Sequence, residues 1–309
     1  MEVLIPILAA AVRSGTPILY ATLGEILTER SGVQNLGLEG LMLMGAFMGF
    51  SVTHATGNPW LGVVAAFVTG AAISLVHAFL SVSIGANQVV SGLAVAMFGT
   101  GASALLGRKM VGLTVTGFGK IPVPVLSGIP VIGPVFFDHD PLVYISYGLA
   151  FFLYWFIFHT RPGLNLRAVG ESPIVVDAMG LSAARLRYVY TLVGGGLAAV
   201  GGSYLSLAYT KMWSEGMSAG RGWIAVALVI FALWNPARAV LGAYLFGGVG
   251  AMQLRIQAAG TSFPAPILMM MPYIFTILVL LVLSVKKGKG IFLGSPGALG
   301  VPYSREDRT

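Results

Sequence analysis

A long stretch almost without charged residues constrains the fold of this chain most strongly. From Ser31 to Gly107 the only Asp, Glu, Lys or Arg is Glu39. Soluble domains carry about a quarter of their residues as charges, whereas this chain carries 9%. Such a run fits a membrane interior, where a helix of about 20 apolar residues pairs its own backbone groups. The sequence therefore predicts an all-α, polytopic membrane bundle, with 1–309 as a single transmembrane domain.

Turn residues divide the apolar sequence into nine candidate spans. Groups such as Gly57-Asn58-Pro59 interrupt the apolar pattern, as Gly and Pro do where helices end. The predicted spans are 4–23, 37–56, 60–82, 88–107, 140–159, 188–210, 222–234, 237–256 and 267–285. The segment 222–234 is short for a membrane crossing, so we expect about nine spans within a range of eight to ten.

Basic residues in the loops predict the orientation, because Lys and Arg are enriched in cytoplasmic loops. The polar segment 160–187 and the tail 286–309 fall on one side of the predicted bundle, which collects eleven basic residues against six opposite. The eleven are Arg30, Arg161, Arg167, Arg185, Arg187, Arg238, Lys286, Lys287, Lys289, Arg305 and Arg308, and the six are Arg108, Lys109, Lys120, Lys211, Arg221 and Arg255. We therefore expect 160–187 and the C-terminus in the cytoplasm. The 108–139 loop is expected outside, with β-like structure at 121–124.

Several classes of function are excluded because the sequence lacks the residues they require or does not space them as they require. The net charge is +7, but too few charges remain to build a face that binds nucleic acid. The chain has no cysteine, and its four histidines have no metal-ligand spacing. It also lacks a G-x-x-x-x-G-K-[ST] phosphate loop. We expect no cofactor, no metal and no enzymatic activity, so that ATP could act only through a partner.

The polar stretch 23–40 separates the first two apolar segments. Glu25, Glu29 and Arg30 predict a helix end at the membrane interface. Glu39 begins a span, where an ionisable side chain is costly unless it faces a bundle interior or water. It could equally be a carboxylate at a helix N-terminus, which the helix dipole stabilises. Both interpretations of Glu39 stay open at this point.

Two neighbouring amides open the fourth predicted span. Asn87 and Gln88 offer donors and acceptors that suit the edge of a base or a polyol. Asn87 could instead be a plain helix cap without further function. The candidate substrate-pathway residues are Gln34, Asn35, Glu39, Asn87 and Gln88.

The segment 160–187 predicts a short helix between two spans. Pro173 suits the first turn of a helix capped by Ser172, and Gly180 suits a left-handed residue at its end. Such a helix, with apolar and acidic faces, could dock into a groove on a cytoplasmic partner. The alternative is an ordinary loop helix that packs on the bilayer surface.

Small residues predict close contacts between helix backbones. The candidates are the pairs Gly45/Gly49 and Gly216/Gly220 and the runs 194–196 and 201–202. The alternative is a helix that is broken to line a pathway.

Four ordered motifs resemble the permease subunits of ABC importers for nucleosides and simple sugars, a group related to branched-chain amino acid permeases. The first begins at Gly24 and reads GEILTERSGVQNLGLEGLMLMGAFMGF. The others are NQVVSG from Asn87, RAVGE from Arg167 and GMSAGRGWIA from Gly216. The resemblance covers about 20–285, which is nearly the whole chain.

This resemblance implies a type II-like importer permease with a cytoplasmic coupling helix within 165–182. It implies an ATPase with two nucleotide-binding domains, often fused in one chain, a second permease subunit (identical or different) and an extracytoplasmic substrate-binding lipoprotein. The protein would be a multi-pass subunit in the inner or plasma membrane of a prokaryote. The residues implied to couple to the ATPase are Arg167, Gly170, Glu171, Asp177, Ala178 and Gly180.

The resemblance implies a translocation pathway for nucleosides, with simple sugars such as ribose or branched-chain amino acids as alternatives. A secondary transporter that works alone is the alternative from another class. Ion-coupled transporters need charged groups inside the membrane. Here Arg13 and Glu39 are the only candidates within spans and away from their ends, which favours the importer subunit.

Overall fold

The computed structural model describes residues 4–260, 264, 267–268, 270–286 and 295–304. Its long helices are α1 Leu4–Arg30, α2 Leu38–Thr56, α3 Pro59–Ala78, α4 Gln88–Gly107, α6 Pro141–His159, α9 Ala183–Tyr204, α10 Arg221–Phe231, α11 Pro236–Ala258 and α13 Met271–Lys286. In the described part of the chain, six helices are long and apolar enough to cross a membrane, namely α1, α3, α4, α6, α9 and α11 with their short extensions. The prediction of a multi-pass helical bundle is confirmed, whereas the full count of about nine spans stays a prediction.

Shorter elements join these helices. They are α5 Ile132–Phe136, α7 Arg161–Glu171, α8 Pro173–Ala178, the π-helical turns η1 Phe79–Ser83 and η4 Leu205–Tyr209, the 3-10 turns η2 Arg108–Met110 and η3 Leu126–Gly128, and the strands β1 Ile121–Pro122 and β2 Asp138–His139. The two strands pair antiparallel, with Ile121 opposite His139. This pairing confirms the β-like structure predicted within the 108–139 loop.

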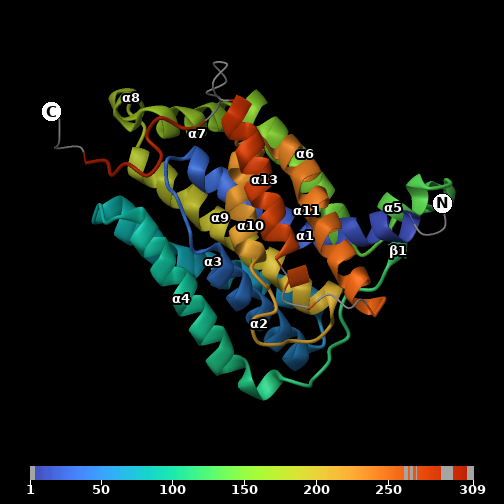
Figure 1. The fold of residues 1–309 in the computed structure, drawn as a ribbon. Coiled ribbons are helices and arrows are strands. Elements are labelled where there is room, and N and C mark those ends of the chain that lie inside the picture. Colours follow the sequence, from blue (N-terminus) through green and yellow to red (C-terminus); the bar gives the residue numbers. More distant parts are fainter. Residues whose placement is uncertain (1–3, 261–263, 265–266, 269, 287–294, 305–309) are drawn as a thin grey trace.

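Helix α9 lies at the centre of the bundle and packs against α1, α2 and α3 (Figure 1). Its glycines allow these contacts. A Cβ at Gly202 would overlap with the carbonyl oxygen of Met42 on α2, and one at Gly45 would overlap with the carbonyl oxygen of Ala199. The prediction of close backbone contacts is therefore confirmed for these positions, because small residues are what let helices associate within a membrane.

The same prediction is wrong for Gly216 and Gly220. Both lie in the turn that precedes α10, where their φ angles are +65° and +79°. Glycine adopts this left-handed conformation without the strain that a Cβ causes. The spacing of four residues therefore reflects two turn positions and not a helix contact.

The helix end predicted at Glu25, Glu29 and Arg30 is present, because α1 ends at Arg30, but its side chains are buried in the protein. Glu25 and Glu29 are fully shielded from solvent. The Asn35 N–H donates to Glu25 Oε1 at 2.9 Å, and the Trp234 indole Nε1 donates to Glu29 Oε2 at 2.5 Å. Arg30 donates to the carbonyl oxygen of Trp234 at 3.2 Å. The turn between α10 and α11 therefore covers this helix end, and its position at the membrane interface stays a prediction.

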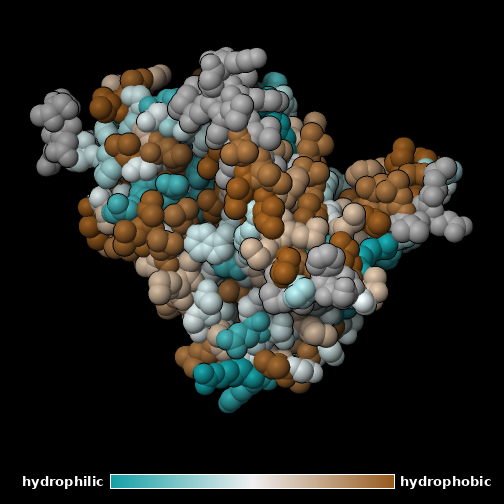
Figure 2. All heavy atoms as spheres, in the orientation of Figure 1, coloured by the Kyte–Doolittle hydropathy of each residue, from teal (hydrophilic) through white to brown (hydrophobic). Residues whose placement is uncertain are grey.

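The surface is divided into zones that suit a membrane protein. Figure 2 shows hydrophobic atoms over α13, on the left-hand side and at α8, with hydrophilic atoms between α8 and α7 and at the lowest tip. The helices therefore present apolar side chains along their length and polar groups at the two ends of the bundle.

Replacing Gly202 with alanine tests the central packing. The new methyl group would meet the α2 backbone, so we expect a loss of about 1–3 kcal/mol, as in other overpacked cores. Gly101→Ala is the control, since a Cβ there meets no atom within 4 Å. Thermal unfolding in detergent should show a lower Tm for Gly202→Ala alone. Equal Tm values for the two variants would contradict the packing argument.

Candidate functional site

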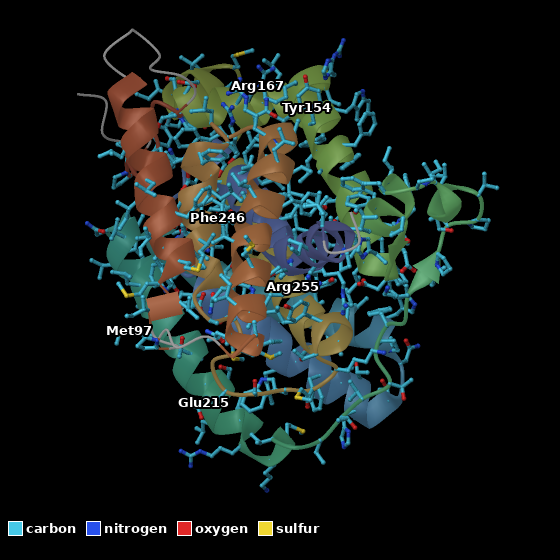
Figure 3. All side chains as sticks on the ribbon, turned by 45° about the vertical axis from the view of Figure 1, so that its right-hand side comes forward. Met97, Tyr154, Arg167, Glu215, Phe246 and Arg255 are labelled. Carbon is cyan, nitrogen blue, oxygen red and sulfur yellow. The ribbon has the colours of Figure 1, made fainter. Side chains whose placement is uncertain are left out.

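A cavity of about 590 Å³ opens among α1, η4, the turn 210–219, α10, α11 and α13. Ligand pockets typically have volumes of about 300–1,000 Å³. Its apolar lining residues include Ile18, Leu205, Met217, Ile224, Phe246 and Leu254. Its polar lining residues are Ser14, Tyr209, Thr210, Ser214, Arg221, Gln253 and Tyr273. Phe246 lies midway along the bundle in Figure 3.

Arg221 is the charged residue among the described residues that line this cavity. Among the described residues that line it, none is acidic. The guanidinium of Arg221 donates to the carbonyl oxygens of Met217 and Ser218, at 3.4 and 3.0 Å. The guanidinium carbons of Arg13 and Arg221 each lie 5.8 Å from the centre of the Tyr209 ring, within cation–π distance. The cavity therefore suits a neutral, partly aromatic or polyhydroxylated ligand better than a cation.

Glu39 holds the turn that forms one wall of this cavity. Its Oε1 accepts from the Ser218 hydroxyl at 2.5 Å and from the Gly220 N–H at 2.9 Å. Its Oε2 accepts from the Gly222 N–H at 2.7 Å. Carboxylates are stabilised by helix N-termini, and here the helix is α10 rather than the one that carries Glu39. The carboxylate lies behind the cavity wall and does not line it.

The other four candidate pathway residues lie in or beside the loop 31–37, away from the cavity. The Gln34 N–H donates to Gln88 Oε1 at 2.7 Å. Asn35 Oδ1 accepts from the Gly37 N–H at 2.8 Å, so the amide shapes its own loop. Asn87 Oδ1 accepts from the Val90 N–H at 3.1 Å. Asn87 is thus a helix cap in this structure, and a role of any of these residues in transport stays a prediction.

His77 is a buried member of this network that the sequence reasoning missed. Its Nδ1 lies 3.0 Å from the Ser91 hydroxyl, and its Nε2 lies 3.1 Å from the Gln34 carbonyl oxygen. Because a carbonyl only accepts, Nε2 carries the proton and Nδ1 accepts from Ser91. The ring therefore joins α3, α4 and the loop 31–37. No local pattern in the sequence marks His77 for this role.

The helix predicted between two spans is present as α8, directly after α7. Pro173 occupies its first turn, and Gly180, with φ +83°, follows its end. One detail is wrong, because Ser172 makes no side-chain capping hydrogen bond. Gly170 is buried, and a Cβ there would overlap with the carbonyl oxygen of Arg30.

The remaining candidate coupling residues lie on several sides of α7 and α8. The guanidinium of Arg167 lies 5.6 Å from the Phe158 ring centre. Glu171 Oε2 accepts from the Gly297 N–H at 3.1 Å, and Asp177 Oδ2 accepts from the Tyr303 hydroxyl at 3.0 Å. The acidic pair therefore contacts the C-terminal segment of this chain. Ala178 and Gly180 are exposed.

The apolar face predicted for the helix after Pro173 is exposed on α8 and on Met179, which follows it. Ile174, Val175 and Met179 are 61%, 54% and 75% exposed, and Ala178 lies beside them. Pro173 and Val176 are buried on the opposite side. The apolar letters at 174–179 are visible in the sequence, but only the packing shows which of them face outward.

The cavity wall and the α7–α8 pair lie toward opposite ends of the bundle. Figure 3 places Arg167, on α7, at the top and Glu215, in the turn beside the cavity, near the bottom. The end that carries Arg167 also holds Arg30, α8 and the turn 232–235, as the contacts described above show. The turn 210–219 and the loop 108–139 share the second end, where Thr114 forms a bridge with Met212.

Comparison with known proteins agrees with this architecture. A family model described as "Branched-chain amino acid transport system / permease component" matches residues 7–285. A putative glucose ABC transporter permease protein of Haloferax volcanii is 40% identical, over 97% of this chain and 98% of its own. A guanosine permease of Bacillus subtilis is 33% identical, over 100% and 99%. A nucleoside permease of Lactococcus lactis is 34% identical, over 93% of each chain. The chain therefore belongs to the permease family of branched-chain amino acid transport systems, as a multi-pass membrane component of an ABC transporter.

Proposed function

We propose that this chain is the membrane subunit of an ATP-driven importer that carries nucleosides across a prokaryotic cell membrane. The observation that carries the proposal is the cavity, with its aromatic and amide-bearing walls and with no acidic residue among the described residues that line it. Two relatives that match along almost their full length are named for guanosine and for nucleosides. In this proposal about nine helices cross the membrane, and α7, α8 and the C-terminus face the cytoplasm.

The chemistry of the lining fits a nucleoside. A nucleobase is flat and apolar on its faces, with donors and acceptors at its edge, and aromatic side chains such as Tyr273 offer a stacking surface. Gln253 can donate to and accept from such an edge, and Ser14 and Thr210 can bind ribose hydroxyls. A zwitterionic amino acid would bring an ammonium group that finds no carboxylate here. The cavity therefore favours a nucleoside over a branched-chain amino acid.

A simple sugar is the second candidate substrate. It is favoured by the 40% identity to the relative named as a putative glucose permease. Hydroxyl groups and aromatic rings also bind sugars, so the lining does not exclude one. Measured uptake must separate the two.

The proposed energy source is a separate ATPase that binds α8. The face formed by Ile174, Val175, Ala178 and Met179 is apolar and exposed at the proposed cytoplasmic end. A short amphipathic helix of this kind suits a hydrophobic groove on a partner. ATP-driven closure of the ATPase pair would then move the helices as rigid bodies and give access from alternate sides. A second permease subunit and an extracytoplasmic substrate-binding lipoprotein complete the proposed complex.

Uptake into proteoliposomes tests the proposed substrate. The complex is reconstituted with its ATPase and binding protein, and radiolabelled adenosine is supplied with unlabelled guanosine, ribose, glucose or leucine as competitors. We expect ATP-dependent adenosine uptake that guanosine reduces and the sugars and leucine do not. Uptake of a sugar alone would make the second candidate correct, and uptake without ATP would contradict the importer.

Gln253→Leu tests whether the cavity binds the substrate. Loss of a hydrogen bond of about 1–1.5 kcal/mol should raise the KM for nucleoside uptake about five- to tenfold. Gln257→Leu is the matched control, because Gln257 is also half-buried on α11 but does not line the cavity. Equal KM values in the two variants would remove the cavity from the pathway.

Ile174→Asp and Met179→Asp test the docking face of α8. A carboxylate placed in an apolar interface loses hydration without gaining a partner, so each change should weaken binding of the ATPase about tenfold or more. Val125→Asp is the control at the opposite end, where Val125 is 88% exposed. Co-purification with the ATPase is the measurement. Unchanged recovery with both α8 variants would contradict docking through this face.

A further inference from the structure

The C-terminal segment 295–304, here called the strap, lies across the end of the bundle that carries α7 and α8. In Figure 1 it is the red segment near α8, on the side of the start of α4. The Ala298 N–H donates to the carbonyl oxygen of Gly170 at 2.8 Å. The strap also donates the two hydrogen bonds described above, from the Gly297 N–H to Glu171 and from the Tyr303 hydroxyl to Asp177. One edge of the strap is thus bonded to α7 and to α8, the helix proposed to bind the ATPase.

The other edge of the strap is bonded to the loop 31–37. The Gly300 N–H donates to the carbonyl oxygen of Gly32 at 3.2 Å. Arg187 on α9, which is 1% exposed, joins the two segments. Its Nη1 donates to the carbonyl oxygen of Val301 and its Nε to that of Ser31, both at 3.2 Å. A buried guanidinium in this position fixes the separation between loop and strap.

The strap is packed as part of the fold. Pro296 and Ala298 are buried, and Leu299 packs against the main hydrophobic core. The Tyr303 ring contacts the small cluster that contains Val169 and Val176 of α7 and α8. The segment 295–304 carries no charged residue. These features fit a segment that is held by the protein rather than one that binds lipid headgroups.

The loop 31–37 is in turn bonded to three helices of the bundle. Glu25 of α1 accepts from the Asn35 N–H, Gln88 of α4 accepts from the Gln34 N–H, and His77 of α3 donates to the Gln34 carbonyl oxygen. A continuous series of hydrogen bonds therefore runs from α8, through the strap and the loop 31–37, to α1, α3 and α4. Coupling between distant sites requires such a connected set of contacts or an equivalent two-state element.

We propose that the strap is a bracket that carries displacements of α8 to the loop 31–37, and through it to α1, α3 and α4. The inference rests on the proposed function, since it takes α8 as the helix that the ATPase moves. Arg187 and Tyr303 are positioning residues in this bracket and do not touch the substrate. The strap stays attached throughout the transport cycle, and its loss separates ATP hydrolysis from movement of the substrate.

Truncation tests the bracket in the reconstituted complex. One variant ends at Gly294 and lacks the strap, and the matched control ends at Ser304 and lacks only 305–309. The number of nucleosides imported per ATP hydrolysed is measured for both. We expect a fall of about tenfold for the variant without the strap, on the scale of typical coupling between sites, and no change for the control. A purely structural segment would lower uptake and hydrolysis together and leave their ratio unchanged, which would overturn the proposal.

Tyr303→Phe gives a milder test that keeps the ring packing. It removes the hydroxyl that donates to Asp177 and leaves the contact with the Val169–Val176 cluster. We expect a fall in nucleosides per ATP of about two- to fivefold, since one hydrogen bond is lost while the ring packing and the other contacts of the strap remain. Tyr188→Phe is the control, because the Tyr188 hydroxyl contacts Ser83 and not the strap. An equal number of nucleosides imported per ATP in the two variants would contradict the role of Tyr303.

A disulfide tests whether the strap stays attached. An ideal Cβ on Gly85 would lie 3.7 Å from the Cβ of Pro302, within the range for a disulfide of about 3.5–4.5 Å. Gly85 has a φ of +72°, so the substitution strains the turn, and the reduced double variant with the same strain is the reference. The chain has no native cysteine, so Gly85→Cys with Pro302→Cys forms one defined crosslink. We expect uptake and its ratio to ATP hydrolysis to match those of the reduced double variant. Loss of uptake on oxidation, restored by reduction, would mean that the strap must detach and would overturn the bracket.

The wild-type complex separates this proposal from the proposed function. If it hydrolyses ATP but imports neither nucleoside nor sugar, the proposed function fails. If it imports nucleosides and the truncations at Gly294 and Ser304 give the same ratio, the bracket alone fails.

Discussion

Backbone-to-backbone packing around α9 is the constraint on which the rest of the structure depends. Lipid tails are as apolar as leucine side chains, so helices in a membrane gain little from hiding apolar surface from one another. They associate through close contact, and glycines on α9 and α2 permit it. The buried helix α9 thereby orders α1, α2 and α3 around itself. The cavity and the docking face of α8 both lie on elements attached to this centre.

Polar side chains complete the bundle by binding backbone groups of other elements. Glu39 accepts from the N-terminus of α10, Arg30 donates to the turn after α10, and Arg187 donates to two segments that lie on either side of it. Buried backbone groups without partners are costly, and these long side chains satisfy groups that the helices leave unpaired. Several residues that look functional in the sequence therefore act first as supports for turns and helix ends.

The sequence predicts much of the architecture, because apolar runs predict the membrane-spanning helices and helix breakers predict where they end. Each predicted span overlaps a helix, and the pairing of Ile121 with His139 agrees with the β-like prediction for the outer loop. Pro173 and Gly180 locate α8 through backbone preferences that are local to the sequence. These features need no knowledge of which helices are neighbours.

The arrangement of the site could not be read in the same way, because it depends on contacts between distant residues. Glu39 and Gly222 are far apart in the chain, and nothing near Glu39 shows that its partner is another helix. From the sequence we expect Asp177 to contact the ATPase. In the structure its carboxylate accepts a hydrogen bond from Tyr303 of the same chain. The sequence predicts an apolar face on α8, but which apolar residues are exposed depends on the packing that buries Val176.

The account requires α8 and the turn beside the cavity to lie on opposite sides of the membrane, with α8 inside. Ala178→Cys and Glu215→Cys each place a single thiol at an exposed position, one at each end of the helical bundle. The chain has no other cysteine. Labelling with a membrane-impermeant maleimide, in cells that lack the ATPase, measures their sides directly. The account predicts that the thiol at position 215 reacts in intact cells and that the one at position 178 reacts only after permeabilisation. Labelling of position 178 in intact cells would contradict it.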